Sequence, residues 1–290
     1  MAYTLTSNVN QLLNQLNQEA FLDGFISEDA DLSWIQVIPT DKNQVINVGV
    51  NPPGQYSTSV EGQDIATQAV EESFASTYNM TGVSLGFSVS LQTKLTMEPG
   101  LLASYFQQMG ASARRRVISD AFGVLDQGTG GTGPDGQPLF SASHPTNVAA
   151  ASNLATTALD YASYETAQRA LVDQQTADGL VAGYKADTLI VPSALNVLAN
   201  KVNTAIYQDA AYMPNISNTM GIKTIVSSDL PSSTSRWFLL DSRFSSIKMY
   251  VLKGSSPVVT EQDPKSLRYI AVDKMIYGTG FDTWRGTFSS

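Results

Sequence analysis

The stretch Gly128–Asn147, GTGGTGPDGQPLFSASHPTN, combines residue types that could do acid-base or nucleophilic chemistry. It holds Ser141 and Ser143 beside His144, the only histidine in the chain. An imidazole can take the proton of a serine hydroxyl, whose oxygen then attacks a carbonyl carbon. Neither serine sits in a Gly-x-Ser-x-Gly turn,, so we favour a hydrogen-bonded loop histidine. A serine hydrolase or a glycan-active β-protein that uses the His144 loop is a remote alternative.

Two other patterns contain residue types that could bind a phosphate or a calcium ion. The glycines of 128–136 could cradle a phosphate, but a P-loop needs a Lys followed by Ser or Thr and then a helix, whereas this run leads into QPLF,. Glu28, Asp29 and Asp31 cluster without the central Gly and closing Glu of a calcium loop,. The chain has no cysteine, which excludes disulfides, zinc-thiolate sites and thiol nucleophiles,. We therefore expect no catalytic residue, no cofactor and no metal.

Charged clusters give further candidates. Glu71 and Glu72 are adjacent, which places them on opposite faces of a strand or about 100° apart on a helix, a poor arrangement for a paired acid and base,. Arg114, Arg115 and Arg116 could touch phosphate, but three consecutive positions fan around a helix,. We expect the glutamates to be exposed and two of the arginines to meet carboxylates at a subunit contact.

The composition describes a folded chain with an unusually uncharged surface. Of 290 residues, 42% are apolar, enough for the core of one large domain or two ordinary ones,. Charged residues make up 15%, against about 25% in ordinary soluble proteins,. The net charge of −9 argues against a specific nucleic-acid binder,. Low charge is typical of secreted all-β proteins and of subunits whose surface is spent on neighbours.

The lack of a targeting signal favours a subunit whose surface is covered by neighbours over a secreted all-β protein. Residues 1–30 lack the basic and apolar regions of a signal peptide, and no run of eighteen apolar residues exists,. We therefore expect no membrane segment and a mature protein that begins near Met1 in a cytoplasm.

Hydrophobic periodicity predicts helices and strands in an unusual order. Helical spacing predicts a short docked helix in residues 1–25, and period-two alternation predicts strands with one apolar face at 44–50 and 83–91,. Residues 51–81 open on Asn-Pro-Pro-Gly and hold few large apolar groups, so we expect an extended arm,. Pro99 begins a helix of about 25 residues, which is long for a compact domain,.

Beyond the glycine-rich loop the pattern alternates between helix and strand, which predicts a compact α/β subdomain. The expected elements are a helix at 160–179, a strand at 186–192, a helix capped by Ser193, and strands at 221–228 and 236–242. The last fifty residues return to candidate strands.

This order resembles the major capsid proteins of tailed bacteriophages, and its details resemble the Mu-like branch of major head subunits. The segment DGQPLFSASHP is similar to the D-G-x-P-L-F-S-x-x-H stretch of that branch, and FDTWRGTF fits an aromatic-Arg strand near the family's C-terminus. The resemblance implies an α+β tailed-phage major capsid protein fold. Its parts would be an N-terminal arm at 1–42, an extended β-hairpin loop at 43–82, a peripheral domain with a long spine helix and β-sheet at 83–154 and 243–290, and an α/β axial domain at 155–242.

The resemblance implies a structural protein and not an enzyme. Such a major capsid protein self-assembles through hexamers and pentamers into an icosahedral shell that encloses the phage double-stranded DNA genome. Implied partners are further copies of the chain, a separate scaffolding protein, a portal, a decoration protein and packaged DNA in non-specific contact, without a membrane. The implied location is the virion, after assembly in the bacterial host cytoplasm.

Contacts between subunits are the sites that this resemblance implies. The candidate residues are Tyr56, Glu61, Glu71, Glu72, Arg114, Arg115, Arg116, Trp284 and Arg285. Between Asn43 and Met80 the sequence has no lysine for a covalent cross-link, so we expect a non-covalent shell. The alternative with the same fold is a nanocompartment shell protein similar to encapsulins, which enclose enzymes instead of DNA.

Overall fold

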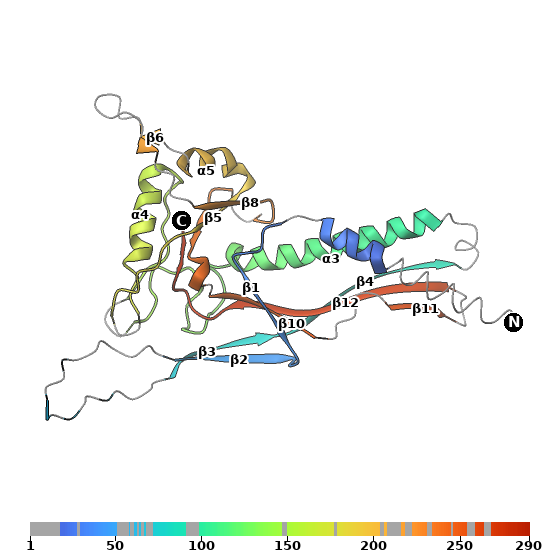
Figure 1. Ribbon diagram of the computed structural model, residues 1–290, viewed down its shortest axis with the longest axis horizontal. Helices are drawn as coiled ribbons and strands as arrows, with labels where there is room; N and C mark the ends of the chain where they lie inside the picture. The colour runs from blue at the N-terminus through green and yellow to red at the C-terminus, as the bar shows by residue number, and fades with distance from the viewer. Residues whose placement is uncertain are drawn as a thin grey trace.

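A long helix lying along long strands dominates the molecule, and a smaller body of helices and strands sits at one end (Figure 1). The computed structural model describes residues 18–27, 30–50, 58, 61–62, 64, 67, 72–90, 99–146, 150–176, 179–203, 206–207, 216–217, 222–230, 234–244, 246–253, 259–263 and 268–290. Within these ranges, no helix has the length and apolar character needed to cross a membrane.

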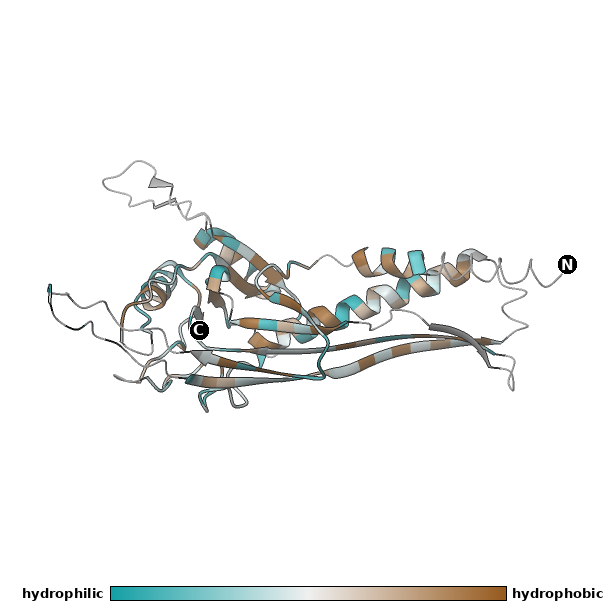
Figure 2. Ribbon diagram, turned by 60° about the horizontal axis from the view of Figure 1, so that its bottom comes forward, coloured by the Kyte–Doolittle hydropathy of each residue, from teal (hydrophilic) through white to brown (hydrophobic). Residues whose placement is uncertain are grey.

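A five-stranded sheet runs along the molecule. Its order is β1 (Gln36–Thr40), β10 (Ile247–Leu252), β12 (Arg268–Phe281) and β11 (Val259–Asp263), with β4 (Thr81–Ser90) also paired to β12. β4 runs antiparallel to β12 from Arg268 to Tyr277, and hydrophobic positions alternate with polar ones along these long strands (Figure 2). β1 pairs in parallel with β10. Residues 36–40, which we expected in the N-terminal arm, are therefore a strand of this sheet.

Helix α3 (Pro99–Asp126) covers one face of the sheet and confirms the long helix predicted from Pro99. Its 28 residues span about 42 Å at 1.5 Å per residue,. Phe106 and Ala113 of the helix pack with Tyr269 and Ala271, which alternate toward it from β12. Burial of this apolar face, and not intrinsic helix propensity, holds so long a helix straight along the strands.

The helix at residues 18–27 crosses α3 at two glycines. A side-chain carbon on Gly24 would overlap the carbonyl oxygen of Gln107, and one on Gly110 would overlap that of Phe21. Glycine at both positions lets the two backbones touch, and Phe21 then packs in the cluster with Phe106. The predicted docking of the N-terminal helix is confirmed for these residues, and residues 1–17 lie outside the described part of the chain.

A second, four-stranded sheet forms the smaller body. Its order is β13 (Thr287–Ser289), β9 (Phe238–Leu240), β5 (Thr188–Pro192) and β8 (Lys223–Ser227). Helices α4 (Tyr161–Val172) and α5 (Asn196–Asn203) pack against it through Tyr164, Leu171 and Ala199. The α/β alternation predicted for this region is therefore present. Short elements complete it: η1 (Ser193–Leu195), β6 (Ile206–Tyr207), β7 (Ile216–Ser217) and η2 (Ser242–Phe244).

Three expectations for this body differ from the structure. The cap position before η1 belongs to Pro192, so Ser193 is not an N-cap. The helix expected at 160–179 is shorter: Asp160 caps α4, because its carboxylate accepts the Ser163 N–H, but the helix ends at Val172 and not at Gly179. β13 pairs with β9, although we expected residues 243–290 to belong to the peripheral domain. The chain's last strand returns to complete the second sheet, and the sequence pattern of so short a strand does not specify its partner.

Strands β2 (Gln44–Val50) and β3 (Glu72–Asn79) form a two-stranded antiparallel hairpin that projects from the long sheet. The base of the hairpin is fixed by polar side chains. Asn47 Nδ2 donates to Tyr250 Oη at 2.6 Å, and Tyr78 Oη donates to Asp282 Oδ1 at 2.7 Å. The extended hairpin predicted in residues 43–82 is thus present in β2 and β3, while most residues between them lie outside the described ranges.

Candidate functional site

The loop with the hydrolase-like residues is a closed structural cluster. The His144 side chain is completely buried and stacks on Trp284, with ring centroids 4.4 Å apart and planes 11° apart. Its Nδ1 lies 2.7 Å from Asp135 Oδ2 and its Nε2 lies 3.0 Å from Asn153 Oδ1. Both ring nitrogens are occupied, so neither is available to activate a serine hydroxyl. The hydrolase alternative therefore has no general base in this loop.

The chain does contain one Gly-x-Ser-x-Gly pattern, at residues 82–86. A nucleophile of this kind needs a sharp turn from a strand into a helix. Ser84 instead lies in the middle of β4, paired with Lys274 of β12. This serine is therefore an ordinary strand residue.

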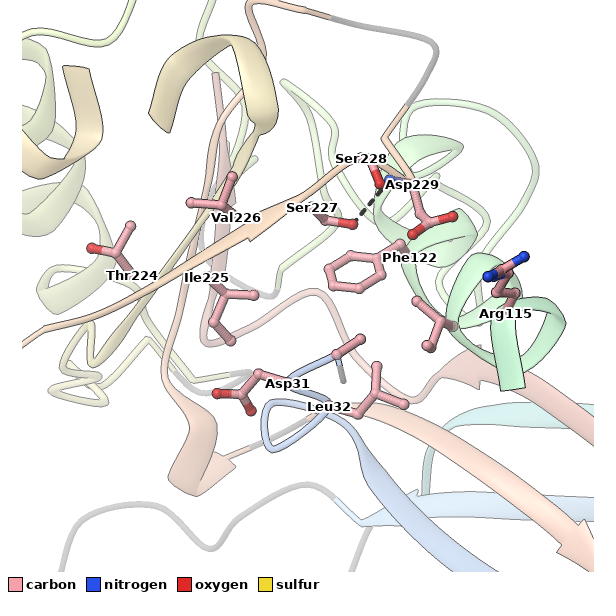
Figure 3. A pocket seen from close by; sticks show the side chains of 12 residues that line it. Asp31, Leu32, Arg115, Phe122, Thr224, Ile225, Val226, Ser227, Ser228 and Asp229 are labelled. Atoms are coloured by element: carbon pink, nitrogen blue, oxygen red, sulfur yellow. Dashed lines mark hydrogen bonds between the residues drawn. The ribbon is translucent and has the colours of Figure 1, made fainter. Parts of the chain in front are cut away.

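A pocket of about 780 Å³ lies between α3, β8 and the segment before β1 (Figure 3). Arg115 and Phe122 reach it from the helix, and Asp229 follows β8. Asp31 pairs with Lys223 at the same place. Partial burial would raise the pKa of Asp31, but hydrogen bonds from Lys223 and Ser33 outweigh burial and lower it. Asp31 is therefore an ionised anchor for the chain before β1 and is not poised as a general base.

Among the described residues, no three His, Cys, Asp or Glu side chains gather in a way that could hold a metal ion. Of the acidic cluster Glu28, Asp29 and Asp31, the first two lie outside the described ranges.

The β2–β3 hairpin presents the clearest candidate for an interaction surface. Its side chains Ile46 and Val48 are 59% and 51% exposed, whereas Ser76 and Tyr78 on the opposite face are buried against the body. Phe74, on the side of Ser76 and Tyr78 but farther from the base, is 50% exposed. Ile46 lies opposite Thr77 and Val48 opposite Ala75, so Ile46 and Val48 share one exposed face. Apolar side chains gathered on a projecting element are typical of a surface that a partner covers.

Four of the candidate contact residues belong to the hairpin region, and the structure describes two of them. Glu61 and Glu72 are exposed, as expected for solvent- or partner-facing carboxylates. Tyr56 and Glu71 lie outside the described residues.

The three arginines of α3 fan around the helix, as their spacing predicts. The Arg114 guanidinium lies 5.5 Å from the centre of the Phe25 ring, and Arg115 is exposed at the pocket of Figure 3. Arg116 Nε lies 3.0 Å from Asp120 Oδ2, one turn along the same helix. Arg116 therefore meets a carboxylate within its own chain, in a geometry that contributes only about 0.3–0.5 kcal/mol at an exposed site.

Trp284 and Arg285 make their contacts inside the chain. Trp284 is 3% exposed, and the Arg285 guanidinium lies 5.2 Å from its ring centre. Arg285 Nε donates to the carbonyl of Gln175 at 2.9 Å. Burial lowers the pKa of Arg285, while the charge of Asp135 acts in the opposite direction. These two residues connect the turn before β13 to the segments that contain His144 and Gln175 of their own chain.

One buried carboxylate has an unusual environment. Asp273 is 2% exposed beneath α3, and its Oδ1 has no hydrogen-bond partner among the described residues. It lines a cavity of about 360 Å³ together with Leu85, Ala113 and Met275. Burial raises the pKa of Asp273 to about 6, although the Lys274 N–H acts in the opposite direction. The alternating apolar residues of this strand did not predict that Asp273 would face inward.

Solved structures that are similar to this chain include phage capsids. The procapsid of bacteriophage JBD30 matches with a TM-score of 0.53 and 15% identity over 98% of this chain and 75% of that chain. The mature capsid of bacteriophage PhiM1 matches with a TM-score of 0.57 and 13% identity over 90% and 86%. A virus-like particle from Pyrococcus furiosus gives 0.51 and 10% over 95% and 98%. The fold is therefore that of phage major capsid proteins.

Comparison of the sequence with models of protein families identifies the family. The model of the phage capsid protein family matches residues 81–289, well over half of the chain. The chain belongs to this phage capsid protein family. A search of curated proteins found no match.

Proposed function

We propose that the chain is the major head protein of a tailed bacteriophage, which assembles through hexamers and pentamers into an icosahedral shell around double-stranded DNA. The family match over residues 81–289 carries this proposal, because it extends over α3 and over strands of both sheets. The role is structural and not enzymatic. The closed His144 cluster supports this, because its histidine is fully used by Asp135 and Asn153.

Self-association is supported by the shape and surface of the hairpin. Extended elements add contact area between copies without enlarging the core of each copy. Ile46 and Val48 would be covered by a neighbouring copy, and their burial would contribute favourable transfer free energy of about 25 cal/mol per Å². The exposed residues Glu61, Glu72 and Arg115 are proposed rim contacts of the same assembly.

Other partners follow from the role. We propose a separate scaffolding protein, a portal and a decoration protein, with assembly in the host cytoplasm and the virion as final location. The net charge of −9 suits an inner surface that touches packaged DNA without binding it tightly,. The division into an N-terminal arm, an extended loop, a peripheral domain and an axial domain also stays a proposal.

A nanocompartment shell is the alternative with the same fold. The likeness to a virus-like particle from Pyrococcus furiosus is a likeness of fold and does not separate the two. The match to the phage capsid family favours a shell around DNA. Portal and terminase genes beside the coding sequence support the phage head, whereas an enzyme gene with a short cargo peptide would support the compartment.

Electron microscopy of the expressed chain tests the proposal. The chain would be produced with and without its scaffolding protein and imaged after negative staining. We expect capsomers, tubes or closed shells, because the apolar hairpin face is unfavourable in water. A protein that stays monomeric under both conditions would contradict the proposal.

A further inference from the structure

The cluster around His144 has a feature that a shell role does not require. Its imidazole is the only one in the chain and is completely enclosed. A buried imidazole in the neutral state has one donor and one acceptor nitrogen. The partners of both ring nitrogens therefore reveal how many protons the ring carries.

The partner of Nε2 is an oxygen that can only accept. The backbone N–H of Ser141 donates to Asn153 Oδ1 at 2.9 Å, and Asn153 Nδ2 donates to the carbonyl of Leu139 at 2.8 Å. An N–H cannot accept and a carbonyl cannot donate, so these two bonds fix which end of the Asn153 amide is oxygen. This oxygen lies 3.0 Å from His144 Nε2. Nε2 must therefore carry a proton.

The partner of Nδ1 is a carboxylate. Asp135 Oδ2 lies 2.7 Å from Nδ1, a distance typical of a charge-assisted bond, and Asp135 Oδ1 accepts the Gln137 N–H at 3.1 Å,. The positive charge of Arg285 interacts with the same carboxylate. An ionised Asp135 has no proton to give, so Nδ1 must also donate.

We propose that His144 is held as an imidazolium cation, a fixed structural charge whose counter-ion is Asp135. The charge joins three parts of the chain: the loop after α3, the segment that contains Asn153, and the turn before β13. Asn153 Nδ2 extends the network to Thr287 Oγ1 at 3.2 Å. The Trp284 ring stacks on the imidazolium and favours a cation at its face,. His144 is thus a positioning residue that fastens the loop between α3 and the second sheet.

The charged groups that face this ring among the described residues are few. Asp135 contacts it directly, and Arg285 lies over the Trp284 ring and close enough to interact with Asp135. One carboxylate is therefore shared by two cations. Loss of the proton on Nε2 would set the lone pair of Nε2 against the lone pairs of Asn153 Oδ1, which is repulsive in a buried site.

Nitrogen NMR of the whole chain tests the proposal directly. Protein labelled with ¹⁵N only in histidine gives signals from one residue, because the chain has one histidine. At pH 7 we expect both Nδ1 and Nε2 to have the chemical shifts of protonated nitrogens, with cross-peaks to an attached hydrogen. A ring with one unprotonated nitrogen would overturn the proposal, and so would an Nδ1 that accepts a proton from Asp135.

A variant tests the counter-ion. Asp135→Asn removes the counter-ion and supplies an amide NH2 group that can donate to an unprotonated Nδ1, so we expect the ring to lose one proton and one nitrogen signal to shift. Asp41→Asn makes the same charge change at an exposed carboxylate and should leave both signals unchanged. Two protonated nitrogens in Asp135→Asn would contradict the role of Asp135. If that variant does not fold, the measurement on the unaltered chain still decides the protonation state.

Discussion

The His144 cluster and the β2–β3 hairpin differ in how far one chain completes them. In the cluster, His144, Asn153 and Trp284 are almost fully buried, and both ring nitrogens of His144 and the amide of Asn153 have partners in the same chain. On the hairpin, Ile46, Val48 and Phe74 keep half or more of their surface exposed. This difference in burial indicates that the two regions contribute to a shell in different ways. The cluster stabilises the subunit, and the hairpin is finished only by a neighbour.

The largest expected effect comes from breaking the cluster. Asn153→Ala removes the partner of His144 Nε2 and leaves the Leu139 carbonyl without its donor. Each buried polar group left unpaired costs about 1–3 kcal/mol, so we expect a loss of about 3–5 kcal/mol in the free energy of unfolding. Denaturant unfolding of the unassembled subunit measures it. Asn200→Ala, at an exposed position of α5, is the matched control and should change stability by less than about 0.5 kcal/mol,.

An intermediate effect of opposite sign is expected at Asp273, a buried carboxylate whose Oδ1 has no hydrogen-bond partner among the described residues. Asp273 has a pKa of about 6, against 3.8 for an unperturbed Asp, because burial penalises its charge. The folded chain therefore binds more protons than the unfolded chain between about pH 4 and 6. Stability from this group is present below about pH 4, falls as the pH rises to 6 and then stays low.

Asp273→Asn removes that penalty. We expect the variant to be more stable than the unaltered subunit by about 2–3 kcal/mol above pH 6, with the difference vanishing near pH 4. Unfolding midpoints between pH 4 and 8 measure this. Equal stability of the two proteins at pH 7 would mean that Asp273 carries no desolvation cost. Asp41→Asn, at an exposed carboxylate, is the control and should show no such pH-dependent gain.

The sequence predicted the regular elements better than the surfaces. Alternation placed β2 and β4, and the spacing from Pro99 placed α3, because burial of one face imposes a period on long elements. The same alternation in Ile46 and Val48 indicated one apolar face but not that this face points outward. Orientation depends on what the opposite face meets, here Tyr250 and Asp282, which are about 200 residues away in sequence.

The candidate site was harder to predict for the same reason. Ser141 and His144 drew attention as catalytic types, yet the partners that define His144 are Asp135 in a turn and Asn153 in an irregular segment. Irregular segments have no periodicity, so nothing in the sequence pairs them. Trp284 and Arg285 were expected at subunit contacts; Trp284, in the turn before β13, is buried within its own chain, and Arg285 beside it is half-buried.

The smallest effect on the stability of the subunit, but a large effect on assembly, is expected at the hairpin. Ile46→Asp with Val48→Asp places charges on side chains that contact mainly solvent in the subunit, so we expect its stability to change by less than about 1 kcal/mol,. Assembly should fail, because a charge buried at a contact is costly without a partner. Ile46→Val with Val48→Ile keeps the apolar face and is the matched control.

Electron microscopy of these two variants beside the unaltered chain is the decisive measurement. We predict closed shells for the unaltered chain and for the control, and folded but unassembled subunits for the doubly charged variant. Shells of normal size and number from the charged variant would contradict the claim that neighbouring copies complete the β2–β3 hairpin.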